Sequence, residues 1–292
     1  MKNNDKITAF RGSLVIPGGR TGVLLIHSLG GNPIELRFVA QSLARQGYTV
    51  YCPLLPGMGG GTDVSGLSTR HDWYNAVEAA HDELKARCDI ILVGGMSAGC
   101  MLALRLAEER PDHVHGLMMF APTFWPNGWA IPKYFHLFRL FRHKFFSQFI
   151  QVQLRAPYGI KDERIRNFVI ESFKSEDRPI EDMYSRGGKL VWEFKRLAIE
   201  VRKGLGKINQ HMLVFHPRED DQSDMSNSML LARQAKGLVE MVVLDDSYHM
   251  VTLDRQRSIV VDRVVDFAQR LSQSIADKQA TSRQVAGNGA AE

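Results

Sequence analysis

The stretch Asp89-Ile-Ile-Leu-Val-Gly-Gly-Met-Ser-Ala-Gly-Cys100 determines the fold prediction for this chain. It starts as a short apolar run, which is typical of a buried strand, and residues 101–107 follow with the apolar spacing of a helix. Between the two lies a G-x-S-x-G pattern, in which Ser97 stands on a sharp turn from strand to helix. The two glycines of the pattern let strand and helix approach closely, so the serine hydroxyl is left exposed above the sheet. Ser97 is therefore a candidate nucleophile; the alternative is an ordinary turn whose glycines serve packing alone.

Strand-like and helix-like sequence alternates on both sides of this turn. Apolar runs predict strands at residues 22–27, 48–53, 114–121, 211–216 and 238–244, and residues 7–10 and 13–16 read as an opening hairpin. Helical spacing predicts helices at residues 33–46, 72–85, 98–110 and 254–271, with Asn32 and Asp72 as N-caps. This alternation predicts an α/β fold with a mostly parallel, doubly wound sheet that helices cover on both faces.

The alternation stops at residue 122 and resumes only after residue 208. The sequence between these points is aromatic, basic and helical, without a convincing core strand. We interpret residues 122–208 as a helical cap over the carboxyl edge of the sheet, where ligands of open α/β sheets bind. Residues 1–121 and 209–271 then form the core, and the polar tail 272–292 is expected to be disordered.

Composition restricts the class of protein. With 292 residues, 44% of them hydrophobic, the chain can bury one large α/β core with an insertion. The net charge of +5 is mild and no nucleic-acid-binding motif is present. The polar N-terminus does not resemble a signal peptide, and no run of about 18 apolar residues predicts a spanning helix. Cys52, Cys88 and Cys100 lack metal-ligand spacing, so we expect buried thiols and a cytoplasmic protein of open oligomeric state.

A serine hydroxyl needs a base to remove its proton and an acid to orient that base. On folds with this turn the chain order is serine, acid, histidine, each on a loop after a strand. His249 follows the strand at 238–244 and is the candidate base, although it could simply cap the next helix. Asp220, Asp221 and Asp224 share the loop after the preceding strand. We favour Asp220 as the acid, because the other two are readily explained as solvated or turn-forming residues.

An acyl-transfer site also needs N–H donors for the oxyanion. One normally follows the nucleophile, here Ala98, and the other lies on the loop after an early strand. That loop is His27-Ser-Leu-Gly-Gly31, which makes Leu29 the second donor. A tight turn would use the same glycines, so the structural and the functional interpretation coexist here. Ser28 and Met96 lie beside these groups and are candidate substrate contacts.

Four motifs together resemble the carboxylesterase and monoacylglycerol lipase branch of the α/β-hydrolase superfamily. The loop at residues 27–31 resembles its H-G-x-x-G motif, and residues 95–99 resemble its nucleophile elbow. Residues 218–221 resemble its acid loop, which places the acid at Asp220, and residues 247–254 resemble its S-x-H-x-x-T-x-D histidine segment. The resemblance implies the α/β-hydrolase fold with a sheet of about eight strands, Ser-Asp-His catalysis and no cofactor.

Two departures concern the substrate. Ser28 replaces the usual glycine after the histidine, so its hydroxyl either touches the oxyanion or only alters the loop. The N-terminal half of the cap has no counterpart, and at helical spacing its aromatic residues share one face: Tyr134, Phe138, Phe141, Phe145 and Phe149. That face either packs on the core, or it lines an acyl pocket or touches an anionic lipid surface. In the second case Phe141 and Phe145 contact the substrate.

The sequence therefore predicts a serine hydrolase of carboxylic esters, with short- to medium-chain acyl esters or monoacylglycerol-like lipids as substrates. Thioester, amide or carbon–carbon bond hydrolysis and acyl transfer use the same triad and stay open. Epoxide hydrolases and haloalkane dehalogenases are disfavoured, because their elbow carries an aspartate where this chain has Ser97. A non-catalytic ligand-binding protein of the same fold is the alternative from another class.

Overall fold

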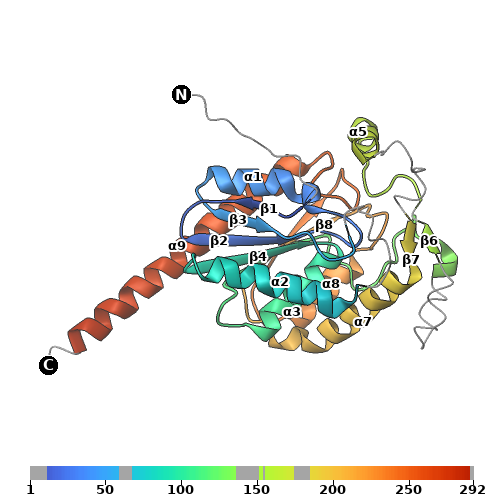
Figure 1. Ribbon diagram of the computed structural model, residues 1–292. Coiled ribbons are helices and arrows are strands. Elements are labelled where there is room, and N and C mark those ends of the chain that lie inside the picture. Colours follow the sequence, from blue (N-terminus) through green and yellow to red (C-terminus); the bar gives the residue numbers. More distant parts are fainter. Residues whose placement is uncertain (1–11, 59–67, 136–150, 154, 174–184, 290–292) are drawn as a thin grey trace.

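The computed structural model describes residues 12–58, 68–135, 151–153, 155–173 and 185–289. Its centre is a seven-stranded sheet in the order β1-β3-β2-β4-β5-β8-β9 (Figure 1). The strands are β1 (Leu14–Ile16), β2 (Thr21–Ile26), β3 (Thr49–Cys52), β4 (Ile90–Met96), β5 (Gly116–Phe120), β8 (Met212–Pro217) and β9 (Val239–Leu244). All neighbouring pairs are parallel except β1 with β3, which confirms the predicted sheet with seven strands rather than about eight. The first strand of the predicted hairpin, residues 7–10, lies outside the described residues.

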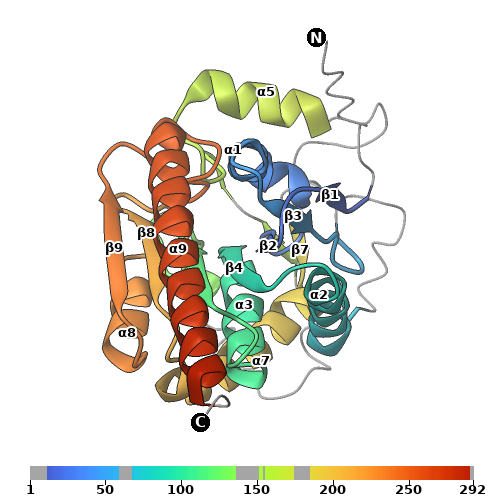
Figure 2. The same cartoon turned by 90° about the vertical axis from the view of Figure 1, so that its left-hand side faces the viewer.

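Helices cover both faces of the sheet, because its central strands are apolar on both sides. Turning the molecule shows α1 (Arg37–Arg45) and α9 (Arg257–Gly289) on one face, opposite α2 (Arg70–Lys85), α3 (Ala98–Glu109) and α7 (Gly188–Gly204) (Figure 2). Short 3₁₀ turns η1 (Pro33–Leu36) and η3 (Leu205–Lys207) adjoin α1 and α7, and α8 (Ser226–Gln234) lies between β8 and β9 in the chain. Each face has its own buried core, as the predicted doubly wound arrangement requires.

The start of α2 differs slightly from the prediction. Thr69, and not Asp72, is the N-cap: its hydroxyl oxygen accepts the backbone N–H of Asp72. The Asp72 carboxylate in turn accepts the Thr69 N–H at 2.8 Å. The two residues form a capping box, in which the acid stands at the third helical position and the N-cap lies three residues before it.

The segment between β5 and β8 contains more than helices. Besides α5 (Glu163–Phe173) it holds two short antiparallel strands, β6 (Gln151–Gln153) and β7 (Ser185–Gly187). Helix α7, which the prediction assigned to the cap, packs its Leu197 and Val201 into the same core as α3. The predicted cap boundary at residue 208 therefore lies beyond a helix that belongs to the main core by its packing.

The C-terminal tail corrects another prediction. Helix α9 continues to Gly289, where we expected it to end near Leu271 and give way to a disordered tail. In Figure 1 its last turns extend away from the sheet. The polar composition of residues 272–289 disfavours deep burial but not helix formation, because alanine, glutamine and lysine are good helix formers. Among the described helices, none combines the length and apolarity that crossing a membrane requires.

Candidate active site

Ser97 lies between the end of β4 and the start of α3, in a conformation that side chains rarely adopt. Its φ is 55° and its ψ −114°. A Cβ atom on Gly99 would lie 2.3 Å from the Ile26 carbonyl oxygen, and one on Gly95 would lie 2.3 Å from the carbonyl carbon of Gly99. Only glycine fits either position, so the strand and the helix meet closely and Ser97 occupies the strained turn between them.

Three predicted residues from distant parts of the chain meet at this turn. The Ser97 Oγ atom lies 2.8 Å from Nε2 of His249, on the loop after β9. The Nδ1 atom of the same ring lies 3.0 and 2.9 Å from the two carboxylate oxygens of Asp220, on the loop after β8. Because a carboxylate only accepts, Nδ1 carries the ring proton and Nε2 is left to accept the Ser97 hydroxyl proton. The contacts form one line from hydroxyl to imidazole to carboxylate.

His249 is buried, with 1% of its surface exposed. Burial disfavours the imidazolium form, but the Asp220 charge and hydrogen bond outweigh it, with smaller contributions from the Asp221 and Glu35 charges. The pKa of His249 therefore lies above its ordinary value. The environment stabilises a positive charge on this ring, which suits a group that takes up a proton.

Asp221 is the neighbour of Asp220 but points elsewhere. Its two carboxylate oxygens accept the backbone N–H groups of Gly159, at 2.8 Å, and His249, at 3.3 Å. Burial and the Asp220 charge raise the pKa of Asp221 to about 6. Asp224 is exposed and accepts the Ser226 backbone N–H at 2.9 Å beside the start of α8. Of the three loop aspartates, Asp220 is the one whose carboxylate meets the His249 ring.

The loop after β2 is held by a histidine and a glutamate. The Leu55 N–H donates to Nε2 of His27 at 3.1 Å, so Nδ1 carries the ring proton and donates to the Ser28 carbonyl oxygen at 2.8 Å. Burial lowers the pKa of His27 to about 4, which keeps the ring neutral. The Ser28 N–H and hydroxyl both donate to the Glu35 carboxylate, each at 2.9 Å. The Ser28 hydroxyl is therefore engaged within the loop, which favours the interpretation that it alters the loop.

Leu29 and Ala98, the predicted oxyanion donors, lie together at a small apolar cavity of about 10 Å³, which has room for about one water molecule. The other lining residues come from the loops after β2 and β3 and from α2, α3 and α7: His27, Leu55, Met58, Trp73, Gly99, Leu102, Phe194 and Leu197. The side chains are almost entirely apolar. This side of Ser97 offers a small apolar recess rather than further polar groups.

Met96, another predicted substrate contact, does not border this cavity. Met96 is fully buried in the core on the α1 and α9 face, because side chains of β4 alternate between the two faces of the sheet. The prediction that Met96 contacts the substrate therefore does not fit its position. Phe141 and Phe145 lie outside the described residues.

Three further polar residues of the site were missed from the sequence. Thr123 places its hydroxyl 3.3 Å from the Ser97 Oγ atom, and Ser223 contacts the Asp220 carboxylate. Glu35 binds Ser28. Each follows the carboxyl end of a strand, which is the one sequence signal that could have indicated them.

Known proteins resemble this chain over most of its length. It is 27% identical over 257 residues to a thermostable monoacylglycerol lipase of Bacillus sp. strain H-257, covering 85% of this chain and 90% of that protein. It is 22% identical to a carboxylesterase of Bacillus subtilis strain 168, covering 87% and 94%. A solved structure from the metagenome-derived lipolytic enzymes LipS and LipT superposes with a TM-score of 0.70 at 24% identity, covering 88% and 97%.

The family comparison covers the same region. Residues 23–263, from β2 into α9, match the profile of the alpha/beta hydrolase family. The matched region includes the elbow, the acid loop and the histidine loop. The chain belongs to the alpha/beta hydrolase family.

Proposed function

We propose that this protein is a serine hydrolase that cleaves carboxylic esters. The observation that carries the proposal is the line of contacts from Ser97 through His249 to Asp220, with its 2.8 Å hydroxyl–imidazole distance. The similarity to proteins named monoacylglycerol lipase and carboxylesterase supports ester hydrolysis over the other reactions of this triad.

In the proposed mechanism the Ser97 Oγ atom attacks the ester carbonyl carbon while its proton passes to Nε2 of His249. The carbonyl oxygen becomes an oxyanion, which accepts the backbone N–H groups of Leu29 and Ala98. The carbon–oxygen ester bond then breaks, and His249 returns the proton to the departing alkoxide. A water molecule deprotonated by His249 attacks the acyl-enzyme, and the second collapse releases the acid and gives the proton back to Ser97. Asp220 orients the ring and stabilises its positive charge throughout.

The geometry also suggests which side of the site takes the acyl group. The leaving alcohol oxygen must face His249, which protonates it, and the oxyanion must face the amides of Leu29 and Ala98. The acyl chain is left with the direction away from His249, where the apolar cavity lies. We propose short- to medium-chain acyl esters or monoacylglycerol-like lipids as substrates, and extension of the pocket requires the side chains around the cavity to move.

The location of the protein is also a proposal. Cys52, Cys88 and Cys100 are free and buried, and burial raises the pKa of all three thiols, which keeps them protonated and unreactive. Reduced thiols favour the cytoplasm.

Labelling with a fluorophosphonate probe tests the proposal, followed by turnover of p-nitrophenyl esters of increasing acyl length beside monoglycerides and thioesters. We expect stoichiometric labelling and ester turnover, both abolished by Ser97→Ala while the melting temperature stays close to that of the wild type. Faster turnover of thioesters than of the matching oxygen esters would move the proposal to thioester hydrolysis. Labelling that persists in Ser97→Ala would contradict the assignment of the nucleophile.

A further inference from the structure

Thr123 occupies an unusual position beside the nucleophile. It lies two residues after Ala121, whose φ of 47° turns the chain sharply at the end of β5. Its side chain is buried, and its Oγ1 atom lies 3.3 Å from the Ser97 Oγ atom and 3.0 Å from the Ser223 Oγ atom. The strained backbone at Ala121 places the Thr123 hydroxyl against the Ser97 hydroxyl, which suggests that this turn serves the active site.

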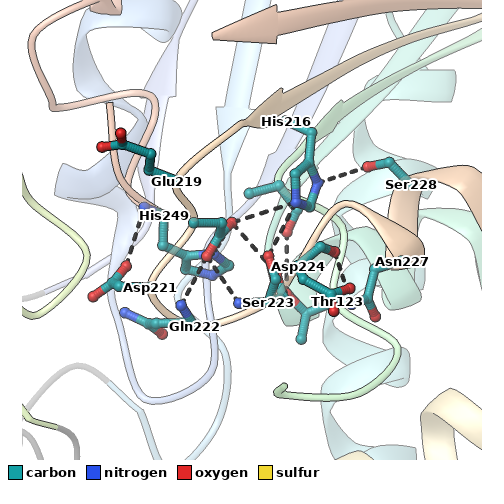
Figure 3. Close-up of polar contacts among 12 residues, drawn as sticks. Thr123, His216, Glu219, Asp221, Gln222, Ser223, Asp224, Asn227, Ser228 and His249 are labelled. Carbon is teal, nitrogen blue, oxygen red and sulfur yellow. Dashed lines mark hydrogen bonds and ion pairs between the residues drawn. The ribbon is translucent and has the colours of Figure 1, made fainter. Parts of the chain in front are cut away.

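Ser223 continues the contact to the acid. Its hydroxyl lies 3.4 Å from Oδ2 of Asp220, and its backbone N–H donates to Oδ1 of the same carboxylate at 2.8 Å. Figure 3 shows Thr123 and Ser223 near His249, with His216 above them in this view. Two rows of contacts therefore lead from Ser97 to Asp220, one through the His249 ring and one through two hydroxyls. Thr123 has one proton to donate, and the Ala121 carbonyl oxygen, 3.1 Å from its Oγ1 atom, is a further acceptor for it, so these contacts are not all hydrogen-bonded at the same moment.

We propose that Thr123 and Ser223 are positioning residues, which hold the Ser97 hydroxyl and the Asp220 carboxylate in line with His249. The inference rests on the proposed function and extends it to two residues outside the triad. It involves no proton transfer along the hydroxyl route. The hydroxyls act only by donating and accepting hydrogen bonds.

The hydrogen-bonding capacity of Thr123 suits both protonation states of His249. When the ring is neutral, Ser97 donates to Nε2, and its oxygen can accept the Thr123 hydroxyl. When the ring is protonated, Nε2 no longer accepts, and the Ser97 hydroxyl donates to the Thr123 oxygen instead. Ser97 thus keeps a partner in either state, so its hydroxyl has no reason to rotate out of reach.

Ser223 acts on the other end. Its hydroxyl donates to the buried Asp220 carboxylate and so draws part of the negative charge away from the His249 ring. A carboxylate whose charge is shared in this way stabilises the His249 imidazolium less strongly. Ser223 therefore moderates the upward shift of the His249 pKa that Asp220 produces.

A purely structural explanation makes different predictions. Buried hydroxyls need partners in any fold, so both residues could simply satisfy each other. In that case their removal lowers stability and leaves the reactivity of Ser97 and the titration of His249 unchanged. Thr49 offers a matched control, because it is also buried with two hydrogen bonds, to Gly18 and Gly19, but lies at the opposite end of the sheet.

The experiment compares Thr123→Val, Thr123→Ser, Ser223→Ala, the Thr123→Val/Ser223→Ala double variant and Thr49→Val. The readouts are the rate of fluorophosphonate labelling and the His249 pKa, followed by NMR of its ring proton. We expect Thr123→Val to slow labelling about fivefold, as loss of one neutral hydrogen bond would, and Thr123→Ser to restore it. Ser223→Ala should also slow labelling and raise the His249 pKa by about half a unit. The double variant should slow labelling by less than the product of the two separate factors, because the residues act as one chain.

Other outcomes would overturn the inference. Labelling at the wild-type rate in Thr123→Val, or an unchanged His249 pKa in Ser223→Ala, would mean that these hydroxyls serve only the packing of the fold. So does a loss of labelling in Thr49→Val as large as that in Thr123→Val. Neither readout depends on ester turnover. If the wild type reacted with the probe but cleaved no ester, the proposed function would be contradicted, and the labelling rates and His249 pKa values of the variants would still test the inference.

Discussion

The two sides of Ser97 differ in polarity. Towards β5, β8 and β9 the hydroxyl faces buried polar groups that hydrogen-bond to one another, namely His249, Asp220, Thr123 and Ser223. Towards β2 and β3 it faces an apolar recess of about 10 Å³ whose walls come from α2, α3 and α7. Directional polar contacts can hold a developing charge, whereas apolar walls discriminate by size and shape. The comparison separates chemistry, on the first side, from substrate selection, on the second.

Because the two roles are separate, a substitution on one side of Ser97 should impair one role and leave the other intact. Changes on the polar side should reduce turnover of all esters alike, because every substrate needs the same proton transfers. Changes on the apolar side should alter the order of preference among substrates while leaving the pH dependence unchanged. Three predictions test this division.

The largest expected effect is that of Asp220→Asn. The asparagine cannot stabilise the imidazolium and favours the wrong ring tautomer, so kcat should fall by about 10⁴-fold, as in the template triad. Asp221→Asn is the matched control and should be much milder, because the Asp221 carboxylate meets two backbone N–H groups and not the ring. Steady-state kinetics across acyl lengths should give the same loss for each ester. If Asp221→Asn abolished turnover while Asp220→Asn had only a small effect, Asp221 and not Asp220 would be the acid.

The pH dependence is the second effect. His249 must be neutral to accept the Ser97 proton, and its raised pKa means that the neutral form is lost already at a comparatively high pH. We therefore expect kcat/KM to rise with pH along a limb centred above about pH 6.5, with about a tenfold loss per unit on its acid side. Short and long esters should share the same limb. A flat profile for chemistry-limited turnover down to the acid side would argue against histidine as the base.

The smallest effect concerns the apolar side. Leu197→Ala should enlarge the recess, so esters with longer acyl chains gain about fourfold in kcat/KM for each methylene newly buried. Val201→Ala, one turn further along α7 in the same core, does not border the recess and should leave the chain-length profile unchanged. Both truncations should lower stability, Leu197→Ala by about 2–5 kcal/mol. If both variants showed the same chain-length profile, α7 would contribute only to the core, and the acyl chain would bind elsewhere.

The polar side was the more predictable of the two from the sequence, because its motifs are local. The strand, the turn and the helix around Ser97 follow from apolar spacing and two glycines, and His249 follows from its place after the last strand. The choice between Asp220 and Asp221 could not be derived from spacing, since adjacent loop residues point in directions that only the folded backbone determines. The character of the loop residues favoured Asp220 without excluding its neighbours, and the resemblance to a known family then placed the acid there.

Other features depend on contacts between distant segments and could not be predicted. Thr123 reaches Ser97 only through the positive φ of Ala121 and the register of β5 beside β4. Met96 was misassigned, because proximity in sequence to Ser97 does not say which face of the sheet a strand residue occupies. The recess combines α2, α3 and α7, and helix α7 lay inside a segment that the sequence assigned to the cap.

Trapping of the acyl-enzyme tests the central claim most directly. The protein is mixed rapidly with a p-nitrophenyl ester and quenched in acid, and the intact mass and the modified peptide are determined for the wild type and Ser97→Ala. The account predicts a mass increase equal to the acyl group, located on the peptide that contains Ser97 and absent from the variant. An acyl group on another residue, or full turnover by Ser97→Ala, would contradict it.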